Sequence, residues 1–584
     1  MIRQYAKLVI TLILLGLAAF GADTWQGTLL QSAADYQSPL QEPLSETTNP
    51  LPPVGSRVVL VIISGLSADV FNQLDLTNFA RLRESGANVT VQSQPPTYPA
   101  STWLTMISGA GPTLTNEALL FPLVGQLRPA SISTLFSLSH RQGKDTALLG
   151  QPLWQDLLPA GSFDRAFFTS LSDQAGDQAI IDRLRDIFED EQLALVVVHF
   201  NGVNFAAETS GGPSSEGYQA SLEQLDRQLG VMLNLLDPDR STVVITSDHG
   251  HIERGGYGGH DETVINLPLI LYGRSVIPGD YSPVNQSDLA PTIAALLGLN
   301  VPATNEGRPL LEMLQLSERE RAIIQITMAR QQFHLTEAYL TSLGFPPPET
   351  DELSKAQRFF DNENYDGTDQ LARLLMTQAA QLRAEADQTR LVAEQIPRFW
   401  LSLSIVLFII LFGLWRRSEL IIQALLAAVV VVGTYHILYR IEDLPYSFSA
   451  MGSVPGIWLD IGRRMAISWL VGLAFFWLLL ILQQMGQTSV ILRGIAELVF
   501  FVAIGFLAPA LYSYWQHGFQ VTWHFPSMAH LFWHYTALLQ GFWAIGLGIL
   551  LSPILLPLNY YIQKWIADYQ HKQFVKLQTR STKT

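Results

Sequence analysis

Apolar segments long enough to cross a membrane constrain this chain more than any other feature. Each of five segments near the C-terminal end approaches or exceeds the roughly 20 residues that a spanning helix needs. These segments are Phe399–Trp415, Glu419–Tyr439, Met465–Leu482, Val490–Leu511 and residues 536–562. A further apolar run, residues 8–20, follows Arg3 and Lys7 as in a signal anchor or a cleavable signal peptide, and we expect an anchor over residues 1–22. The pattern predicts a multi-pass membrane protein with a five-helix membrane region over residues 398–562.

Basic residues beside these segments predict how the chain is oriented. If all six segments cross, one side of the membrane carries Arg3, Lys7, Arg416, Arg417, Arg493, Lys564, Lys572 and Lys576. Arg463 and Arg464 lie on the other side and are the exception. Because positive charge accumulates on the cytoplasmic side, we expect the basic tail, residues 563–584, to be cytoplasmic and residues 23–397 to be extracytoplasmic.

The charge balance and the absence of one residue type exclude several functions. The net charge of −15 gives no basic stripe for nucleic acid, so no nucleic-acid partner is expected. The chain has no cysteine, which excludes disulfides and thiolate metal ligands. An exported domain without cysteine is typical of a bacterium, and we expect a bacterial source.

The region between the N-terminal apolar run and the five C-terminal segments has the pattern of an α/β domain. Residues 23–55 are rich in Pro, Ser, Gln and Thr and are predicted to be a linker. Continuous apolar runs at Val58–Ile63, Leu195–Val198 and Thr242–Thr246 are typical of buried parallel strands. Helical patterns such as Ser221–Leu236 lie between them, which predicts an α/β sheet. Residues 316–397 are helical and charged, and we expect a solvated stalk or a packing helix without a functional site.

Six motifs in this region resemble those of the alkaline phosphatase superfamily. They are VVLVIISGLSADVF (58–71), PPTYPASTWLTMISGAGP (95–112), LGQPLWQDLLP (149–159), VVHFNGVNFAAETSGGP (197–213), VVITSDHGHIERGGYGGHDET (243–263) and SDLAPTIAALLGLNVPATNEG (287–307). Their order and spacing are most similar to the branch of type I phosphodiesterases, nucleotide pyrophosphatases and GPI-ethanolamine-phosphate transferases. The resemblance implies an alkaline-phosphatase-like sandwich with a mostly parallel central sheet over residues 56–315, beside the C-terminal transmembrane helix bundle.

The resemblance also implies a metal site, which this sequence preserves only in part. Members of the superfamily hold two divalent cations, usually zinc, with Asp and His ligands at the carboxyl ends of the strands. Asp248, His249 and His260 match ligand positions. Three ligand positions are changed, since Ser64 and Asn204 replace aspartates and Glu208 replaces a histidine. We therefore expect Zn²⁺ or another divalent cation to bind once rather than twice, or not at all.

The nucleophile position is changed as well. In register with the related phosphodiesterases, Pro99 occupies the place of the Thr or Ser that attacks phosphorus, and proline has no hydroxyl. Thr97 and Ser101 are candidates for a displaced nucleophile, although these hydroxyls and that of Thr102 fit helix capping better. Tyr257 lies near the expected pocket, where it either contacts a headgroup or packs on the surface.

These changes favour a degenerate member of the superfamily. The first hypothesis is a membrane-anchored, phosphodiesterase- or phosphoethanolamine-transferase-like protein that binds a phosphorylated lipid, glycan or protein partner with little turnover. The alternative is an active metal-dependent phosphodiesterase or phosphotransferase that uses a displaced nucleophile or an activated water. A third hypothesis is a membrane scaffold. Membrane lipids are expected partners in every case, and the sequence identifies no protein partner.

Overall fold

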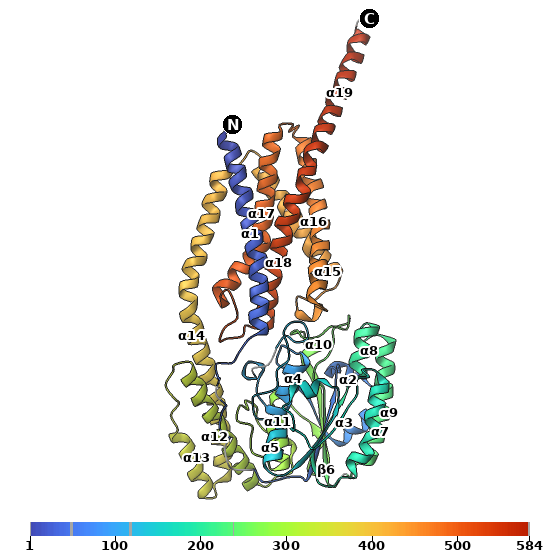
Figure 1. The fold of residues 1–584 in the computed structure, drawn as a ribbon, viewed down its shortest axis with the longest axis vertical. Helices are drawn as coiled ribbons and strands as arrows, with labels where there is room; N and C mark the ends of the chain where they lie inside the picture. The colour runs from blue at the N-terminus through green and yellow to red at the C-terminus, as the bar shows by residue number, and fades with distance from the viewer. Residues whose placement is uncertain (1, 42, 47–50, 116–118, 238, 582–584) are drawn as a thin grey trace.

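The computed structural model describes residues 2–41, 43–46, 51–115, 119–237 and 239–581 (Figure 1). An α/β domain, with its strands and helices between Arg57 and Met313, lies at one end of an elongated molecule, and a bundle of long helices lies at the other (Figure 1). Within the described residues, six helical segments are long and apolar enough to cross a membrane. The predicted combination of an α/β domain and a membrane helix bundle is therefore confirmed.

The α/β domain is built on a nine-stranded sheet with the order β4-β3-β5-β1-β6-β7-β2-β8, and β9 also pairs with β2. The strands are β1 (Arg57–Ile63), β2 (Ala87–Gln92), β3 (Asp145–Gly150), β4 (Arg165–Phe168), β5 (Leu193–Phe200), β6 (Ser241–Thr246), β7 (Asn266–Tyr272), β8 (Gly279–Asp280) and β9 (Val284–Asn285). Strands β4, β3, β5, β1 and β6 are parallel to one another, while β7 is antiparallel to both β6 and β2. The three apolar runs predicted as strands are β1, β5 and β6, which lie side by side in the centre of the sheet.

Strand β1 contributes to a core on each face of the sheet. Alternate side chains of a strand point to opposite faces. Val58, Leu60 and Ile62 accordingly pack with residues of α4, α11 and α12, while the intervening residues pack with α3, α7 and α9. The helices of the domain are α2 (Ala68–Gln73), α3 (Thr77–Ser85), α4 (Pro99–Ser108), α5 (Leu135–Arg141), α6 (Leu153–Leu157), α7 (Gln174–Phe188), α8 (Gly202–Ser210), α9 (Glu216–Leu235), α10 (Glu262–Ile265) and α11 (Leu289–Leu297), with 3₁₀ turns at Pro112–Leu114, Gln286–Asp288 and Leu311–Met313.

A layer of three helices joins this domain to the bundle. They are α12 (Glu318–Ser342), α13 (Asp351–Asp361) and α14 (Tyr365–Arg416). Phe333 of α12 and Leu375 of α14 are buried in the same core as the sheet. The region expected to be either a solvated stalk or a packing layer is thus a packing layer. Helix α14 has 52 residues and continues from this layer into the bundle without interruption (Figure 1).

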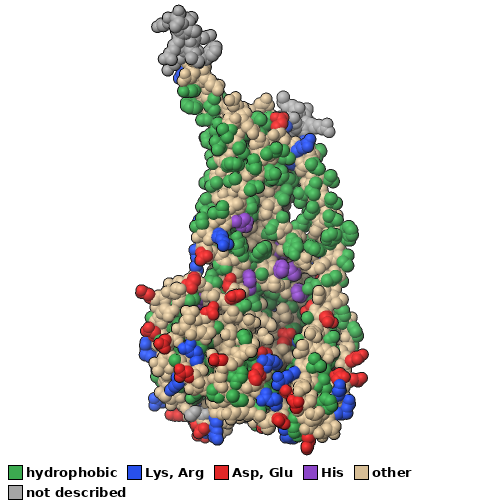
Figure 2. Space-filling view, turned by 180° about the vertical axis from the view of Figure 1, so that it is seen from behind, with side chains coloured by type: hydrophobic (Ala, Val, Ile, Leu, Met, Phe, Trp, Pro, Cys, Tyr) green, Lys and Arg blue, Asp and Glu red, His purple; other side chains and the backbone are tan. Residues whose placement is uncertain are grey.

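The bundle contains the remaining long helices and the end of α14. These are α1 (Ile2–Ala34), α15 (Ile421–Ile441), α16 (Val454–Leu482), α17 (Thr488–His517), α18 (Met528–Leu551) and α19 (Leu555–Ser581), with 3₁₀ turns η4 (Phe448–Ala450) and η5 (Ser552–Ile554). The boundary expected after residue 22 is wrong, because α1 continues to Ala34. Trp25 packs the part of α1 beyond residue 22 against the rest of the molecule. Its ring stacks on Phe519 at 5.1 Å, and its Nε1 donates to the Phe519 carbonyl at 2.7 Å. The surface of the bundle is largely apolar (Figure 2).

The α/β domain contacts the bundle through a glycine-rich loop, residues 255–260. The Gly259 amide donates to Ser449 Oγ at 3.1 Å, and the His260 amide donates to Ser447 Oγ at 3.3 Å. Both serines are buried at η4, which connects α15 and α16. A loop that follows the central strand β6 is therefore held directly on the membrane bundle.

This contact leaves no room for a side chain at Gly256. A Cβ built there would lie 1.9 Å from the Ser449 carbonyl oxygen, so Gly256→Ala must push the loop away from η4. We expect amides of residues 252–260 to exchange hydrogen about tenfold faster in the full-length variant, because their local opening becomes easier. Gly452→Ala is the matched control, since nothing lies within 4 Å of a Cβ there. Equal exchange in wild type and in Gly256→Ala would contradict the observed docking.

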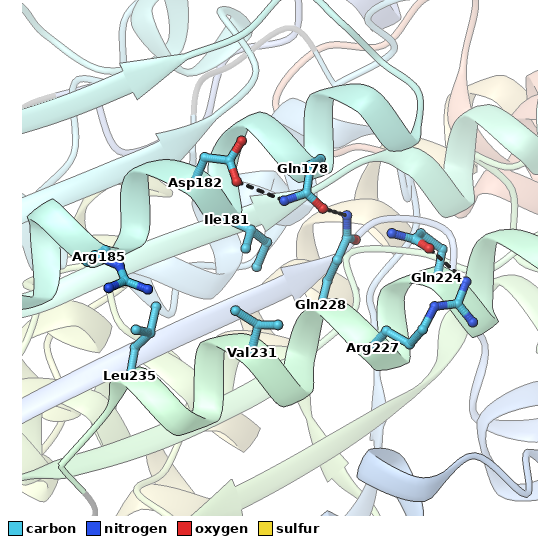
Figure 3. A pocket seen from close by; sticks show the side chains of 9 residues that line it. All are labelled: Gln178, Ile181, Asp182, Arg185, Gln224, Arg227, Gln228, Val231 and Leu235. Carbon is cyan, nitrogen blue, oxygen red and sulfur yellow. Dashed lines mark hydrogen bonds between the residues drawn. The ribbon is translucent and has the colours of Figure 1, made fainter.

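A surface groove of about 320 Å³ lies between α7 and α9, as Figure 3 shows. Its polar side chains bond to one another: Gln178 Nε2 donates to Asp182 Oδ1 at 2.8 Å, and Gln228 Nε2 donates to Gln178 Oε1 at 3.3 Å (Figure 3). The groove lies on helices that cover one face of the sheet and away from the strand ends. We assign it a packing role.

Candidate functional site

The candidate site lies at the carboxyl ends of three adjacent parallel strands. Ser64 directly follows β1, His199 lies near the end of β5, and Asp248 and His249 follow β6. Parallel α/β sheets bind their ligands at this edge, because the strand ends and the loops after them converge there. The fold thus brings Ser64, Asp248 and His249 together, as the motifs predicted.

Asp248 is fully buried, and protein donors occupy both of its carboxylate oxygens. Trp103 Nε1 donates to Oδ2 at 2.9 Å, and Ser64 Oγ donates to the same oxygen at 3.0 Å. The amide of His249 donates to Oδ1 at 2.9 Å. In this arrangement the carboxylate is held by an indole, a hydroxyl and a backbone amide, which are the kinds of partner that a buried charge requires.

These partners decide the ionisation of Asp248. Burial alone raises the pKa of the carboxyl group. The nearby His249 and His199 together with the hydrogen bonds from Trp103 and Ser64 outweigh burial, so that the pKa of Asp248 lies below its usual value. Asp248 is therefore a stable carboxylate at neutral pH and is not suited to act as a general acid.

Two aromatic side chains occupy the space beside Asp248. The rings of Trp103 and Trp154 stack with their centroids 4.4 Å apart, and both side chains are buried. Trp154 Nε1 donates to His199 Nδ1 at 3.2 Å, which leaves the proton of the neutral imidazole on Nε2. That Nε2 lies 4.0 Å from Asp248 Oδ2, and burial lowers the pKa of His199 to about 4. A neutral histidine thus directs an N–H toward the carboxylate.

His249 is oriented by the carbonyl of Gly250 and by the ring of Tyr257, in the loop that follows β6. Its Nδ1 bonds the Gly250 carbonyl at 3.1 Å, so its Nε2 carries the lone pair, 3.4 Å from Ser64 Oγ. The ring of Tyr257 stacks on that of His249 at 3.9 Å, and the Tyr257 hydroxyl bonds Glu208. The interpretation of Tyr257 as a surface tyrosine is therefore wrong, because its ring covers the site.

His251 is a site residue that the sequence analysis did not single out. Its Nδ1 bonds the Gly255 carbonyl at 2.8 Å, while its Nε2 is buried without a hydrogen-bond partner among the described residues. A Cβ at Gly65 would lie 2.6 Å from that Nε2, so glycine is needed after Ser64. Burial lowers the pKa of His251 to about 3. The sequence could have indicated His251, because it lies two residues after His249 in SDHGH. His199 could likewise have been found, because it belongs to the His-Phe pair that ends β5.

Asn204 and Glu208 lie one turn apart on α8 and bond to each other. Asn204 Nδ2 donates to Glu208 Oε1 at 3.4 Å and to Asn201 Oδ1 at 3.3 Å, while Asn204 Oδ1 is buried without a partner among the described residues. No hydrogen bond joins either side chain to Asp248 within the described part of the chain. The second half of the expected metal site is thus represented by an amide and a carboxylate already bonded to neighbours.

His260 lies at the contact with the bundle, where its amide bonds Ser447. Its Nδ1 is buried without a partner among the described residues. The structure does not group this histidine with Asp248 and His249 as metal ligands. Throughout the described ranges, no three His, Asp or Glu side chains are arranged so that they could hold a metal ion.

The hydroxyls expected near the nucleophile position have other roles. Pro99 is the first residue of α4, where its missing N–H costs nothing. Thr97 Oγ1 accepts from the Gly258 amide at 3.1 Å and donates to the Gly259 carbonyl at 3.4 Å. Ser101 Oγ is buried without a partner among the described residues, and no cap hydrogen bond is made at the start of α4. Thr97 therefore holds the glycine-rich loop, and the capping role expected for these hydroxyls is wrong.

The donor set does not fit the two cations of the superfamily. Metal ligands must offer free lone pairs, but hydrogen bonds occupy three of the roughly four lone-pair sites of Asp248, and the His199 nitrogen that faces it carries a proton. The free lone pairs of His249 and His251 belong to rings set edge to face, 5.1 Å apart. We derive no chemical step through a metal.

Comparisons with known proteins agree with the motifs. A family model described as "Metalloenzyme superfamily" matches residues 166–301, and that name indicates divalent metal use in the superfamily. The catalytic subunit of GPI ethanolamine phosphate transferase 3 of Mus musculus is 28% identical over 288 residues, which are 44% of this chain and 26% of that protein. The corresponding subunit of transferase 2 of Homo sapiens is 26% identical over 355 residues, 53% of this chain and 35% of that protein.

The chain therefore spans about a quarter to a third of the length of these relatives. Among solved structures, wild-type alkaline phosphatase PafA aligns with a TM-score of 0.38 and 11% identity, covering 46% of this chain and 100% of that one. The chain is a multi-pass membrane protein, and its resemblance to the alkaline phosphatase superfamily and to the GPI ethanolamine phosphate transferases is confirmed.

Proposed function

We propose that this phosphoethanolamine-transferase-like membrane protein binds a phosphate-bearing lipid or lipid-linked glycan at the strand ends of its α/β domain and turns it over little or not at all. The observation that carries the low turnover is the state of Asp248. In a metal-dependent phosphotransferase this carboxylate would hold a cation, whereas here an indole, a hydroxyl and an amide donate hydrogen bonds to both of its oxygens. Loss of the nucleophile at Pro99 acts in the same direction, since each missing element costs several kcal/mol of transition-state stabilisation.

The position of the site supports a membrane-bound ligand. The loop that carries Tyr257 and His260 rests on η4, so the edge of the sheet with the candidate site faces the bundle (Figure 1). A ligand that is anchored in the bilayer would therefore lie close to this edge. We further propose that the α/β domain is extracytoplasmic and the basic tail cytoplasmic, which the distribution of Lys and Arg supports.

Metal analysis of the full-length protein in detergent tests this proposal. We expect less than one zinc ion per chain and no metal-dependent hydrolysis of bis(p-nitrophenyl) phosphate. Stoichiometric zinc together with hydrolysis that is lost in Asp248→Ala would establish the active enzyme instead. A thermal shift with phosphoethanolamine-bearing lipid, absent with neutral lipid of equal chain length, would support binding. Binding of neither lipid would leave the bundle as the functional part and would refute the proposal.

Restoring one carboxylate should restore metal dependence. Ser64→Asp places a second carboxylate beside Asp248, where the serine hydroxyl now lies 3.0 Å away. Two like charges this close repel in a buried site, so we expect the variant to melt below wild type without metal. Zinc should raise the melting temperature of Ser64→Asp by several degrees and leave wild type unchanged, because a ligand stabilises only the form that binds it. Ser64→Asn is the matched control without charge. Equal zinc stabilisation of all three proteins would contradict this interpretation of the site.

A further inference from the structure

A basic cavity lies at the end of the bundle opposite the α/β domain. Its volume is about 490 Å³, and residues of α1, of α17 and at the end of α14 line it. Four cationic side chains line it, namely Lys7, Arg416, Arg417 and Arg493. All four belong to the ends of membrane spans, since α1 spans from Ala6, α14 ends at Arg416 and α17 begins at Thr488. Figure 2 shows basic side chains, with an acidic one beside them, at this end of the largely apolar bundle surface.

The positive charge of this cavity is not balanced by nearby acids. None of its four cations forms an ion pair within the described residues. Glu497 attracts both Arg416 and Arg493 through space, but it is itself buried and accepts from the amide and hydroxyl of Ser418. Glu497 carries one negative charge against the four positive charges that line the cavity, and Ser418 already engages its oxygens.

Arg416 is the most constrained of the four cations. Its side chain is 93% buried, since its exposed fraction is 7%. Nη1 donates to the Ala496 carbonyl at 3.1 Å, and the guanidinium lies 5.1 Å from the centre of the Phe500 ring. The other guanidinium nitrogens form no hydrogen bond with the described residues. A buried cation with unused donors requires an anion, because a carbonyl and a ring face do not neutralise it.

The surroundings of the cavity indicate that this anion belongs to a lipid. Leu414 and Trp415, just before Arg416, are 61% and 44% exposed, and Lys7 Nζ lies 4.8 Å from the centre of the Trp415 ring. Exposed Trp and Leu beside basic residues mark the boundary between acyl chains and headgroups. We propose that the cavity binds the phosphate-bearing headgroup of an anionic phospholipid.

This assignment goes beyond the general excess of positive charge on one side of a membrane protein. That excess requires only that cations lie near the ends of the spans. It does not require cations of different helices to meet in one cavity. Here three helices distant in sequence direct their cations into one cavity, and one guanidinium is withdrawn from solvent. Basic pockets between membrane helices are a known form of anionic headgroup recognition, because the guanidinium fork matches phosphate oxygens. The inference does not depend on the function of the α/β domain.

Native mass spectrometry of the full-length protein tests the proposal. The protein is exchanged into detergent with defined mixtures of tetraoleoyl cardiolipin, dioleoyl phosphatidylglycerol and dioleoyl phosphatidylcholine. We expect wild type to retain the anionic lipids in preference to phosphatidylcholine. The double variant Arg416→Gln, Arg493→Gln should lose that preference by about tenfold or more, since each cation near an anionic surface contributes on the order of 1 kcal/mol.

The chain supplies a control with the same loss of charge. Lys564→Gln, Lys572→Gln removes two exposed cations of α19 that do not line the cavity, and we expect it to retain lipid like wild type. Equal retention by the arginine variant, or equal losses in both variants, would overturn the proposal. Saturable binding of inorganic phosphate that cardiolipin does not displace would also overturn it, since the site would then take a free anion. If the arginine double variant does not fold, Arg417→Gln replaces it, because Arg417 is exposed and forms no ion pair within the described chain.

Discussion

Replacing Asp248 with alanine should destabilise the α/β domain by about 3–5 kcal/mol, because it removes the common acceptor of three buried donors. Trp103 Nε1, Ser64 Oγ and the His249 amide would lose their partner in a region from which water is excluded. The expected result is a melting transition of the full-length protein that begins well below that of wild type. Thermal denaturation followed by circular dichroism measures it.

The direction of this effect distinguishes two kinds of site. In a metal site without its metal, a buried carboxylate is strained, and its removal stabilises the fold at the expense of function. In a site saturated by protein donors, removal destabilises. Asp248→Asn keeps the shape and one acceptor oxygen, so we expect an intermediate loss that is unchanged by EDTA. A variant Asp248→Ala as stable as wild type would show that the three hydrogen bonds do not contribute.

Trp103→Ala should lower stability by a comparable amount, about 3–5 kcal/mol, because it leaves a large cavity in a well-packed core. The indole is 1% exposed, stacks on Trp154 at 4.4 Å and packs edge to face on His199 at 4.6 Å. The substitution also removes a hydrogen bond to a buried charge. We expect the melting temperature of Trp103→Ala to fall about as far as that of Asp248→Ala.

A double-mutant cycle separates packing from hydrogen bonding. Trp103→Phe keeps most of the aromatic contact and loses only the N–H donor, so its expected cost is about 1–3 kcal/mol. Combining Trp103→Phe with Asp248→Ala should cost less than the sum of the two, because the pair acts as a unit. Strict additivity would mean that Trp103 and Asp248 are independent, in conflict with the 2.9 Å contact.

The centre of the fold was predictable because its residues follow simple rules. Val58–Ile63 is a continuous apolar run, and the structure buries every side chain of it between two helical layers. The six apolar segments are helices for the same reason: a bilayer demands length and apolarity, and both are visible in a sequence. The end of α1 was missed because Trp25 continues the helix through a contact with Phe519, far away in the chain.

The candidate site was predictable only in its motif-bearing corner. Ser64, Asp248 and His249 converge because adjacent strands end at the same edge. The donor Trp103 lies 145 residues before Asp248, and no local pattern indicates that their side chains meet. The position of His260 is equally long-range, since it depends on serines of η4 in another part of the molecule. Motifs indicate well which residues lie at strand ends. Tertiary packing decides which partners then donate hydrogen bonds to a residue such as Asp248.

The uninterrupted course of α14 sets a geometric rule for the whole molecule. The 52 residues of this helix, Pro397 among them, rise about 78 Å along its axis, and each residue added would rotate the bundle end relative to the domain end by about 100°. One end of α14 is packed in the core of the α/β domain, and the other end lies against α17 of the bundle. The loop at residues 255–260 makes a second contact between the domain and the bundle, at η4. The number of residues in α14 therefore fixes how the α/β domain is placed relative to the bundle. It sets both the distance of the strand ends from the membrane and their rotation about the helix axis.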